Sequence, residues 1–293
     1  MNQPVVLDLD HSVGPLPHRL VVPLEHWQES LRFCCSAATL RKFARVLDDV
    51  LPLQYGTVFL GSGDFHHLSL PLIARKASTQ PFQVVVLDNH PDNMRFPFGV
   101  HCGSWVRSVT ALAQIAHVHV VGICSQDVGL RHAWENYLAP LCQGRLTYWC
   151  IGVDVRWAHR LGMASAFRTF ADADTLTDAF IDHQRRFARP AYLSIDKDVF
   201  SIDVAHTNWD QGVLQPKHAR SLIGALDAGL IGSDITGEVS SYRYRRRWKR
   251  ILAAIDAQPP VDECALSAWQ ARQFELDLEL LDAMADLYTN AST

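Results

Sequence analysis

The sequence predicts an α/β protein with a three-layer α/β/α sandwich built on a mainly parallel sheet. Apolar segments typical of buried strands alternate along the chain with segments of helical periodicity, which is the pattern of βαβ units. One apolar segment, residues 84–87, is mostly β-branched, as expected for a strand covered on both faces. No linker-like stretch or internal repeat divides the chain, so we expect residues 1–293 to form a single domain.

Each element is predicted from its own pattern. Helical spacing with outward-facing Arg and Lys predicts a helix over 31–51, and Pro71 is acceptable in the first turn of a helix that begins near residue 68. A further helix is expected from about residue 104, and the amphipathic segment 266–288 closes the chain as a helix. The remaining expected helices are 174–187 and 216–228, and the expected strands are 4–10, 57–60, 84–87, 118–123, 146–151, 191–196 and 230–236.

The composition limits which binding partners and which cellular compartment we expect for this protein. With 293 residues, 48% of them hydrophobic, the chain can bury a core without disulfides or structural metals. A net charge of −4 implies no general affinity for nucleic acid or membrane surfaces. The odd number of cysteines, seven, without a Cys-x-x-Cys pair indicates reduced thiols. Since the N-terminal residues also lack the pattern of a signal peptide, we expect a cytoplasmic protein.

Acidic and histidine side chains follow the strand at 84–87. Asp88, His90 and Asp92 come directly after it, and alternation along an extended chain places all three on one side. In open α/β sheets, functional groups collect beyond the carboxyl ends of the strands. Two carboxylates and an imidazole this close would repel and desolvate one another without a cation, although a strand followed by an Asx-rich turn has the same local pattern.

Other strand ends carry residues of the same types. A donor set of carboxylates and imidazoles without thiolates suits manganese, iron or zinc, and a set rich in oxygen favours manganese. The candidates exceed what one ion requires, whereas two ions with bridging carboxylates would use them all and would activate a shared water. The six candidate ligands are His66, Asp88, His90, Asp92, Asp196 and Asp198.

These segments resemble a known family, the ureohydrolases, which include arginase, agmatinase and formimidoylglutamase. Residues 88–92, Asp-Asn-His-Pro-Asp, resemble the Asp-Ala-His-x-Asp motif, and residues 194–198 are similar to the Ser-x-Asp-x-Asp motif. Residues 63–71 resemble the Gly-Gly-Asp-His segment and its helix; aligning Leu70-Pro71 with that helix makes His66 the ligand and His67 a packing neighbour. Residues 101–104 resemble the His-Gly segment with one inserted residue, so the likeness spans about 57–240.

The resemblance implies an arginase-like fold, two Mn²⁺ ions per chain (other divalent metals being compatible) and hydrolysis of a C–N bond in a guanidino, amidino or formimino compound. It implies one ion held by His66, Asp88, Asp92 and Asp196, and a second held by Asp88, His90, Asp196 and Asp198. A metal-bridging hydroxide would attack the substrate carbon. Glu238 would contact the guanidinium, and His101 would transfer protons.

Several positions depart from the family pattern. Met94 and Pro97 stand where arginase has polar contacts to its substrate, which predicts poor activity on arginine. Asp210 lies in a rebuilt loop and could supply a second acceptor for a cationic substrate. The basic segment 242–250 is interpreted as a solvated helix face or a subunit contact, so a homo-oligomer is an open expectation.

Two alternatives to a binuclear hydrolase stay open. One is an arginase-fold protein that binds metal but has lost turnover and acts as a binding or assembly subunit. The other is a deacetylase-like hydrolase with a single zinc ion, although one ion would leave carboxylates unpaired.

Overall fold

A nine-stranded sheet forms the centre of the computed structural model, which describes residues 3–76, 78, 80–255 and 261–290. Its strand order among these residues is β2-β1-β4-β11-β10-β5-β7-β8-β9, and every neighbouring pair runs parallel. The strands are β1 (Val5–Asp8), β2 (Leu20–Pro23), β4 (Val58–Phe59), β5 (Phe82–Leu87), β7 (Ile115–Ile123), β8 (Leu146–Ile151), β9 (Phe167–Phe170), β10 (Ala191–Asp196) and β11 (Leu230–Thr236).

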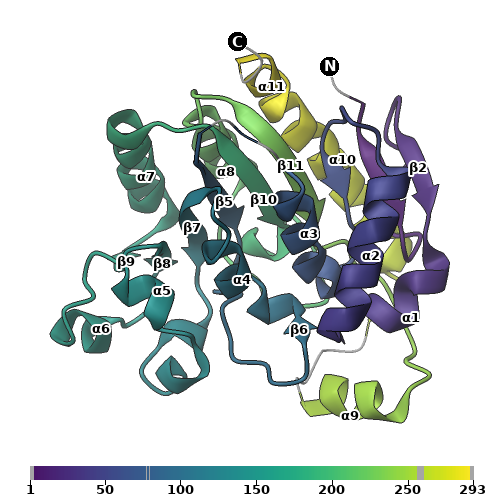
Figure 1. The fold of residues 1–293 in the computed structure, drawn as a ribbon, viewed down its shortest axis with the longest axis horizontal. Helices are drawn as coiled ribbons and strands as arrows, with labels where there is room; N and C mark the ends of the chain where they lie inside the picture. Colours follow the sequence, from purple (N-terminus) through teal and green to yellow (C-terminus); the bar gives the residue numbers. More distant parts are fainter. Residues whose placement is uncertain (1–2, 77, 79, 256–260, 291–293) are drawn as a thin grey trace.

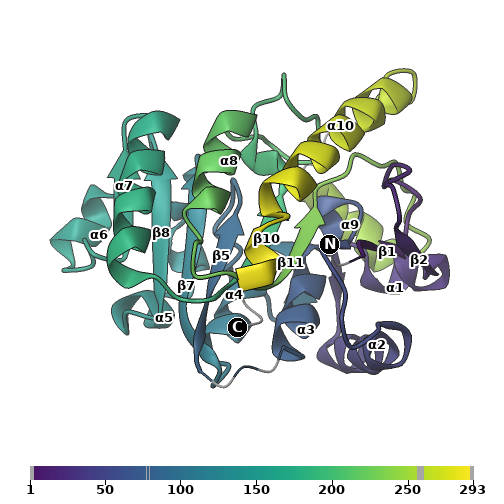
Figure 2. The same ribbon diagram turned by 90° about the horizontal axis from the view of Figure 1, so that it is seen from above.

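Helices cover both faces of this sheet (Figures 1 and 2). One face carries α2 (Ala37–Val50), α3 (Ser69–Ala74), α4 (Val106–Thr110) and α5 (Ala139–Cys142), and the other carries α7 (Ala173–Phe187), α8 (Pro216–Gly224) and α10 (Leu266–Met284). The remaining α-helices are α1 (Gln28–Leu31), α6 (Arg156–Arg160), α9 (Arg247–Ile255) and α11 (Leu287–Asn290). The predicted three-layer α/β/α sandwich is therefore confirmed.

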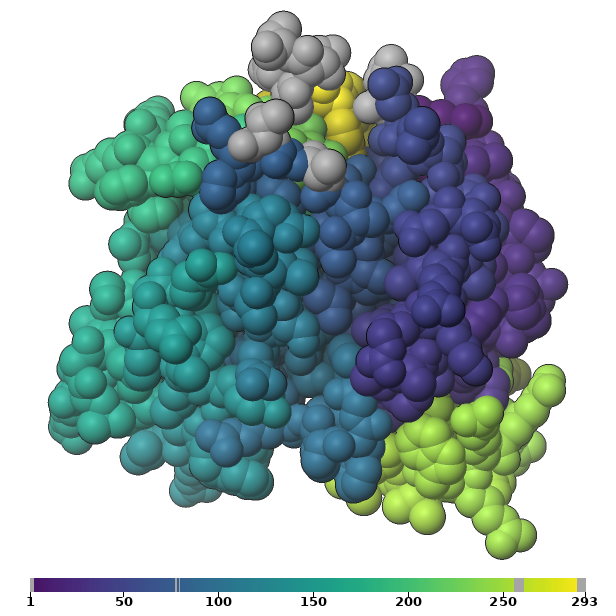
Figure 3. Space-filling view, in the orientation of Figure 1, coloured from purple at the N-terminus to yellow at the C-terminus, as the bar shows by residue number. Residues whose placement is uncertain are grey.

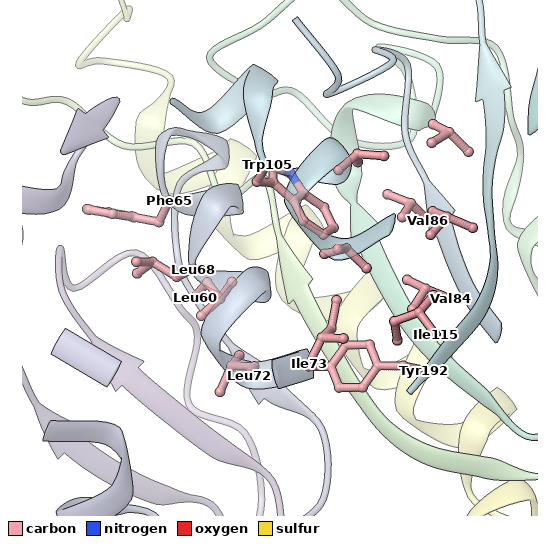
Figure 4. Packing of buried hydrophobic residues seen from close by; sticks show 14 of the residues in the cluster. Leu60, Phe65, Leu68, Leu72, Ile73, Val84, Val86, Trp105, Ile115 and Tyr192 are labelled. Carbon is pink, nitrogen blue, oxygen red and sulfur yellow. The ribbon is translucent and has the colours of Figure 1, made fainter. Parts of the chain in front are cut away.

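Two hydrophobic clusters lie on opposite faces of the sheet. Val84 and Val86 of β5 join the cluster beneath α2, α3 and α4, whereas Val85 and Leu87 join the cluster beneath α7, α8 and α10. Figure 4 shows Val84 and Val86 in the first of these clusters together with Trp105. Burial on both faces explains why residues 84–87 of this strand are all apolar, as the sequence indicated.

Some element boundaries differ from the sequence prediction. The helix expected over 31–51 begins at Ala37, because the Ser36 hydroxyl caps it by accepting a hydrogen bond from the Thr39 backbone N–H at 3.1 Å. The residues just before it, β3 (Cys34–Cys35), pair antiparallel with β6 (Val100–His101). The segment expected over 266–288 divides into α10 and α11. The edge strands β2 and β9 were not predicted.

The basic segment 242–250 leads into α9, whose yellow-green residues form the lower right edge of the molecule in Figure 3. Five of its arginines are exposed, which agrees with a solvated face: Arg243, Arg245, Arg246, Arg247 and Arg250. Lys249 is buried instead, and its ammonium donates to the backbone oxygen of Arg32 at 2.6 Å. Among the described residues, no helix is both long and apolar enough to cross a membrane.

The strand order places the candidate motifs together. β4, β11, β10 and β5 are consecutive neighbours in the sheet, and their carboxyl ends lie at one edge because the strands are parallel. The short 3-10 helices η2 (Gly63–Leu68) and η6 (Lys197–Val199) begin at this edge, as does the segment that follows β5. All six predicted ligands are therefore carried on segments that converge.

Candidate metal centre

A cavity of about 350 Å³ opens at the carboxyl edge of the sheet. All six predicted ligands line it, together with the predicted catalytic residue His101 and the predicted substrate residue Asp210. Further lining residues include Met94, Cys102, Gln126, Asp127 and Trp209. The indole of Trp209 thus belongs to the wall of the cavity.

The first group of possible metal ligands consists of His66, Asp88 and Asp92. Nδ1 of His66 lies 2.9 Å from Oδ2 of Asp92 and 3.2 Å from Oδ2 of Asp88. All three residues are buried. Their ligand atoms lie close enough together for one cation to contact all three.

The imidazole of His66 is oriented from its far side by residues that sequence reasoning did not identify as part of the site. Its Nε2 lies 3.0 Å from the Ser194 hydroxyl, and that hydroxyl donates to Oδ1 of Asp234 at 2.7 Å. Asp234 also accepts hydrogen bonds from Ser69 and Tyr192. Since the Ser194 proton is committed to Asp234, Nε2 of His66 donates to Ser194, and Nδ1 is directed at the carboxylates.

The second group consists of Asp88, His90 and Asp198, so Asp88 is common to both groups. Nδ1 of His90 lies 2.9 Å from Oδ2 of Asp198. On the other side of the ring, Nε2 lies 2.8 Å from Oδ1 of Asp210, which also accepts a hydrogen bond from the Asn89 amide at 3.2 Å through its Oδ2. The hydrogen bond from His90 lowers the pKa of Asp210. Asp210 therefore holds His90 in place as well as lining the cavity.

Asp196 belongs to the same cavity but to neither of these groups. Its Oδ2 lies 3.4 Å from Nδ1 of His66, and its Oδ1 accepts the backbone N–H of Asp198 at 3.2 Å. Two glycines allow this approach, because a Cβ on Gly63 would lie 3.0 Å from Oδ2 of Asp196 and a Cβ on Gly237 would lie closer still to Oδ1. The bridging role that the resemblance implies for Asp196 stays a prediction.

The donor set fits divalent cations. Asp88 is common to both groups, and its buried Oδ2 accepts no hydrogen bond among the described residues, although Nδ1 of His66 lies 3.2 Å from it. Burial, together with the nearby charge of Asp88, raises the pKa of Asp92 to about 6 and that of Asp198 to about 7. These shifts mean that the protein alone does not compensate the negative charge it gathers here, which a cation would do.

The turn that carries Asp92 is strained. Asp92 has a φ of 46°, in the left-handed region that non-glycine residues rarely adopt. Its Oδ2 accepts a hydrogen bond from the indole N–H of Trp105 at 2.6 Å, and its backbone oxygen accepts from Val106 at 2.9 Å. These bonds hold the carboxylate towards His66.

The two candidate histidines outside the ligand set differ in their surroundings. His101 lines the cavity between two aromatic rings: edge-on to Phe33 at 4.4 Å and stacked on Phe96 at 5.2 Å between centroids. Its Nδ1 accepts the backbone N–H of Gly103 at 3.0 Å. His67, in contrast, is fully buried, neither ring nitrogen has a hydrogen-bond partner among the described residues, and burial lowers its pKa well below the usual value. The structure places His67 in packing and outside both ligand groups, as expected.

Glu238 is engaged by another side chain of the protein. It is not among the residues that line the cavity. Its buried carboxylate is paired with the ammonium of Lys197, which also lies 2.6 Å from Oδ1 of Asp277 on α10. A buried cation of the chain holds this carboxylate, and the contact of Glu238 with a substrate guanidinium that the resemblance implies stays a prediction.

Residues near the mouth also bear on the substrate. Met94 lines the cavity as predicted, and Pro97 is exposed outside it. Asn93 is buried and donates to the Tyr148 hydroxyl at 2.8 Å, away from the cavity. Asp127 lines the cavity, although its sequence context, a loop acid after a strand, did not distinguish it.

Comparisons with known proteins extend these observations. No family model matches the chain. An uncharacterized protein from Thermotoga maritima is 28% identical over 204 residues, which are 69% of this chain, and the chain spans only 65% of the length of that relative.

Solved structures resemble it along most of its length. A hypothetical agmatinase from Burkholderia thailandensis is 18% identical with a TM-score of 0.51, over 97% of this chain and 87% of that one. Proclavaminate amidinohydrolase from Streptomyces clavuligerus is 16% identical with a TM-score of 0.53, over 97% and 93%. Agmatine ureohydrolase of Thermoplasma volcanium is 12% identical with a TM-score of 0.51, over 98% and 92%. The chain therefore has the arginase-like α/β/α fold of the ureohydrolases, which its sequence motifs predicted.

Proposed function

We propose that this chain belongs to the ureohydrolase family and is a binuclear manganese hydrolase that cleaves a C–N bond of a small guanidino, amidino or formimino compound. The observation that carries the proposal is that two ligand groups share Asp88 at the carboxyl edge of a sheet with this fold. It is supported further by the buried Oδ2 of Asp88, which accepts no hydrogen bond from the residues that the structure describes.

The residues that would hold the ions are the six predicted from sequence: His66, Asp88, His90, Asp92, Asp196 and Asp198. Oxygen donors outnumber nitrogen donors in this set, and no thiolate is among them, which favours manganese over zinc. When bound, the ions supply Lewis acidity and lower the pKa of a water molecule towards neutrality.

The protein's own contribution is orientation and proton transfer. Ser194 and Asp210 fix the rings of His66 and His90 by hydrogen bonds to their outer nitrogens. His101 accepts the Gly103 N–H at Nδ1, so in its neutral form the proton resides on Nε2. We assign to His101 the protonation of the nitrogen that leaves when the C–N bond breaks; the imidazolium form donates the proton and returns to the neutral ring.

We also assign recognition of a cationic head group to two acids besides Glu238. Asp127 and Asp210 are the carboxylates of the cavity wall that lie outside the proposed ligand set. The side chain of Asp210 is 69% exposed, so it lies near the mouth while still holding His90. The Met94 side chain, which lines the cavity, cannot supply the polar contact that arginase makes to its substrate at this position. We therefore still expect poor activity on arginine.

The test has two stages. The purified protein is stripped with chelator, reconstituted with Mn²⁺ and assayed for metal content; two ions per chain are expected, and one tightly held zinc ion would contradict the binuclear assignment. Release of urea is then measured with arginine, agmatine and 4-guanidinobutyrate, and release of formamide is measured with formimidoylglutamate. Arginine is expected to have a low kcat/KM, and two bound ions without any turnover would contradict the hydrolase.

One observation favours a second candidate, a metal-binding protein of this fold without turnover. The pairing of Glu238 with Lys197 engages the carboxylate that the resemblance assigned to the guanidinium. A protein of this kind would bind two ions and release no product from any compound of the panel.

A further inference from the structure

A second cavity, of about 680 Å³, adjoins the candidate metal centre. Gln126 lines both cavities, so they meet at η4 (Gln126–Val128). The second cavity lies between the loop that follows η4 and helix α6. Figure 1 shows α6 at the lower left of the molecule. A substrate bound at the metal centre therefore has a neighbouring space into which a tail could extend.

The two cavities carry opposite charge. Six aspartates line the first: Asp88, Asp92, Asp127, Asp196, Asp198 and Asp210. The second is lined by Arg131, Arg156 and Arg160 and by one acid, Asp154. Asp154 is engaged by Arg156, whose Nη2 lies 2.6 Å from Oδ2. In the part of the chain that the structure describes, no ion pair joins Arg131 or Arg160 to a carboxylate, although the charge of Arg160 helps to lower the pKa of Asp154. Three guanidinium groups therefore face one carboxylate in this cavity.

The wall that carries these arginines is held by hydrogen bonds. The indole N–H of Trp157 in α6 donates to the backbone oxygen of Val128 in η4 at 3.1 Å. The buried amide of Asn136 donates to the backbone oxygen of Asp127 at 2.8 Å. Arg131 and Arg160 are exposed, and these hydrogen bonds connect the segments that bear them to η4, whose Gln126 lines both cavities.

From this arrangement, and resting on the proposed function, we infer that the substrate carries an oxyanion tail, a carboxylate or a phosphate, which Arg131 and Arg160 bind. Guanidinium groups match both oxyanions through paired N–H donors. A cationic tail would meet an excess of positive charge in the same place. The substrate class is thus a guanidino or amidino compound with a negatively charged end.

The probes are chosen to differ in the charge of the tail. 4-Guanidinobutyrate and agmatine have similar length and the same head group, but end in a carboxylate and an ammonium, respectively. 2-Guanidinoethyl phosphate provides the phosphate. Dissociation constants are measured by calorimetry on the manganese-loaded protein, and urea release is measured in parallel. The variants are R131A/R160A and, as the matched control, R41A, which removes an exposed arginine from α2.

The parent protein is expected to bind an anionic compound more tightly than agmatine, and the better of the two anions identifies the tail group. R131A/R160A should weaken binding of that compound by about tenfold or more, since a charge-assisted hydrogen bond contributes about 1.5 kcal/mol or more. Binding of agmatine should not weaken, and R41A should match the parent. Rising salt should reduce the preference because the arginines are exposed.

Agmatine binding as tightly as both anions, or an unchanged preference in R131A/R160A, would overturn the tail site. If either of these results were found and urea were still released from agmatine, the proposed hydrolase activity would be supported and the tail site would be rejected. Conversely, the expected binding pattern without product from any compound would support the tail site and contradict turnover.

Discussion

The ammonium of Lys197 and the carboxylate of Glu238 form a buried ion pair directly behind the candidate metal centre. Lys197 stands between Asp196 and Asp198 in the sequence, yet its side chain leaves the cavity and reaches Glu238 and Asp277. Burial alone would lower the pKa of Lys197, but the two carboxylates outweigh it and raise that pKa. One lysine thus links β10, the end of β11 and α10.

The substitution K197M tests this link. It would leave Glu238 and Asp277 buried without a cation, and we expect the free energy of unfolding to fall by about 3–5 kcal/mol. The matched control is K217M, which removes an exposed pair with Asp174 and should change stability by about 1 kcal/mol or less. Urea denaturation of both variants provides the comparison. A loss in K197M no larger than in K217M would contradict the importance of the buried pair.

Because Asp88 is common to both ligand groups, D88A is expected to lose both ions. H66A should mainly weaken one ion, since His66 belongs to one group. D127N is the control, because Asp127 lines the same cavity outside both groups and should retain two ions. Elemental analysis after manganese reconstitution measures the content. Two ions in D88A would show that Asp88 is not shared.

His101 lines the cavity without belonging to a ligand group, so H101A should keep its metal content. If His101 donates the proton to the leaving nitrogen, kcat should fall by about 10²–10⁴-fold. The measurement is steady-state turnover on the best substrate of the panel, paired with metal analysis of the same sample. Unchanged kcat would return His101 to a packing role between Phe33 and Phe96.

His67 is buried with no hydrogen-bond partner for either ring nitrogen among the described residues. The variant H67L exchanges these unsatisfied polar atoms for methyl groups, so we expect the free energy of unfolding to be unchanged or raised by about 1 kcal/mol. H66L is the contrasting variant, because it breaks the contact with Ser194 and should lower stability. Chemical denaturation distinguishes them, and a loss above about 2 kcal/mol in H67L would reveal a partner for His67.

His117 on β7 predicts a pH dependence of stability away from the metal centre. Burial lowers the pKa of His117 to about 4, and it also lowers the pKa of the neighbouring His119 and His183. Between pH 6.5 and about 4 the unfolded chain binds a proton at His117 and the folded protein does not. Stability should therefore fall as pH falls through this window, by at most about 1.4 kcal/mol per pH unit for this residue.

Urea unfolding at pH 7 and pH 5 measures this effect. The variant H117Q should lose less stability than the parent between the two pH values. H26Q, which replaces an exposed histidine, should behave as the parent does. An identical pH dependence in H117Q and the parent would exclude His117 as the source.

The sheet and most of the ligand residues could be predicted because their signals are local. Strands covered on both faces are largely apolar, as β5 and β8 are apart from Gln83 and Thr147, and acids of the site follow such strands directly. The start of the helix expected over 31–51 was predicted less accurately. Cys34 belongs to β3 and pairs with His101 of β6, and a pairing between residues so far apart leaves no local signal in the sequence. The edge strands β2 and β9 were missed because they are short and partly exposed, without a continuous apolar pattern.

What the sequence determined by itself was the fold class and the set of side chains at the carboxyl edge of the sheet, since both follow from the order of residues within single strands. Only the tertiary structure decided which partners those side chains have. Asp210 pairs with His90, Asp234 accepts a hydrogen bond from Ser194, and Glu238 forms an ion pair with Lys197. The physical reason is that hydrogen bonds and buried ion pairs join residues distant in sequence, whose relative positions are set by the packing of the whole sheet and its two helical layers.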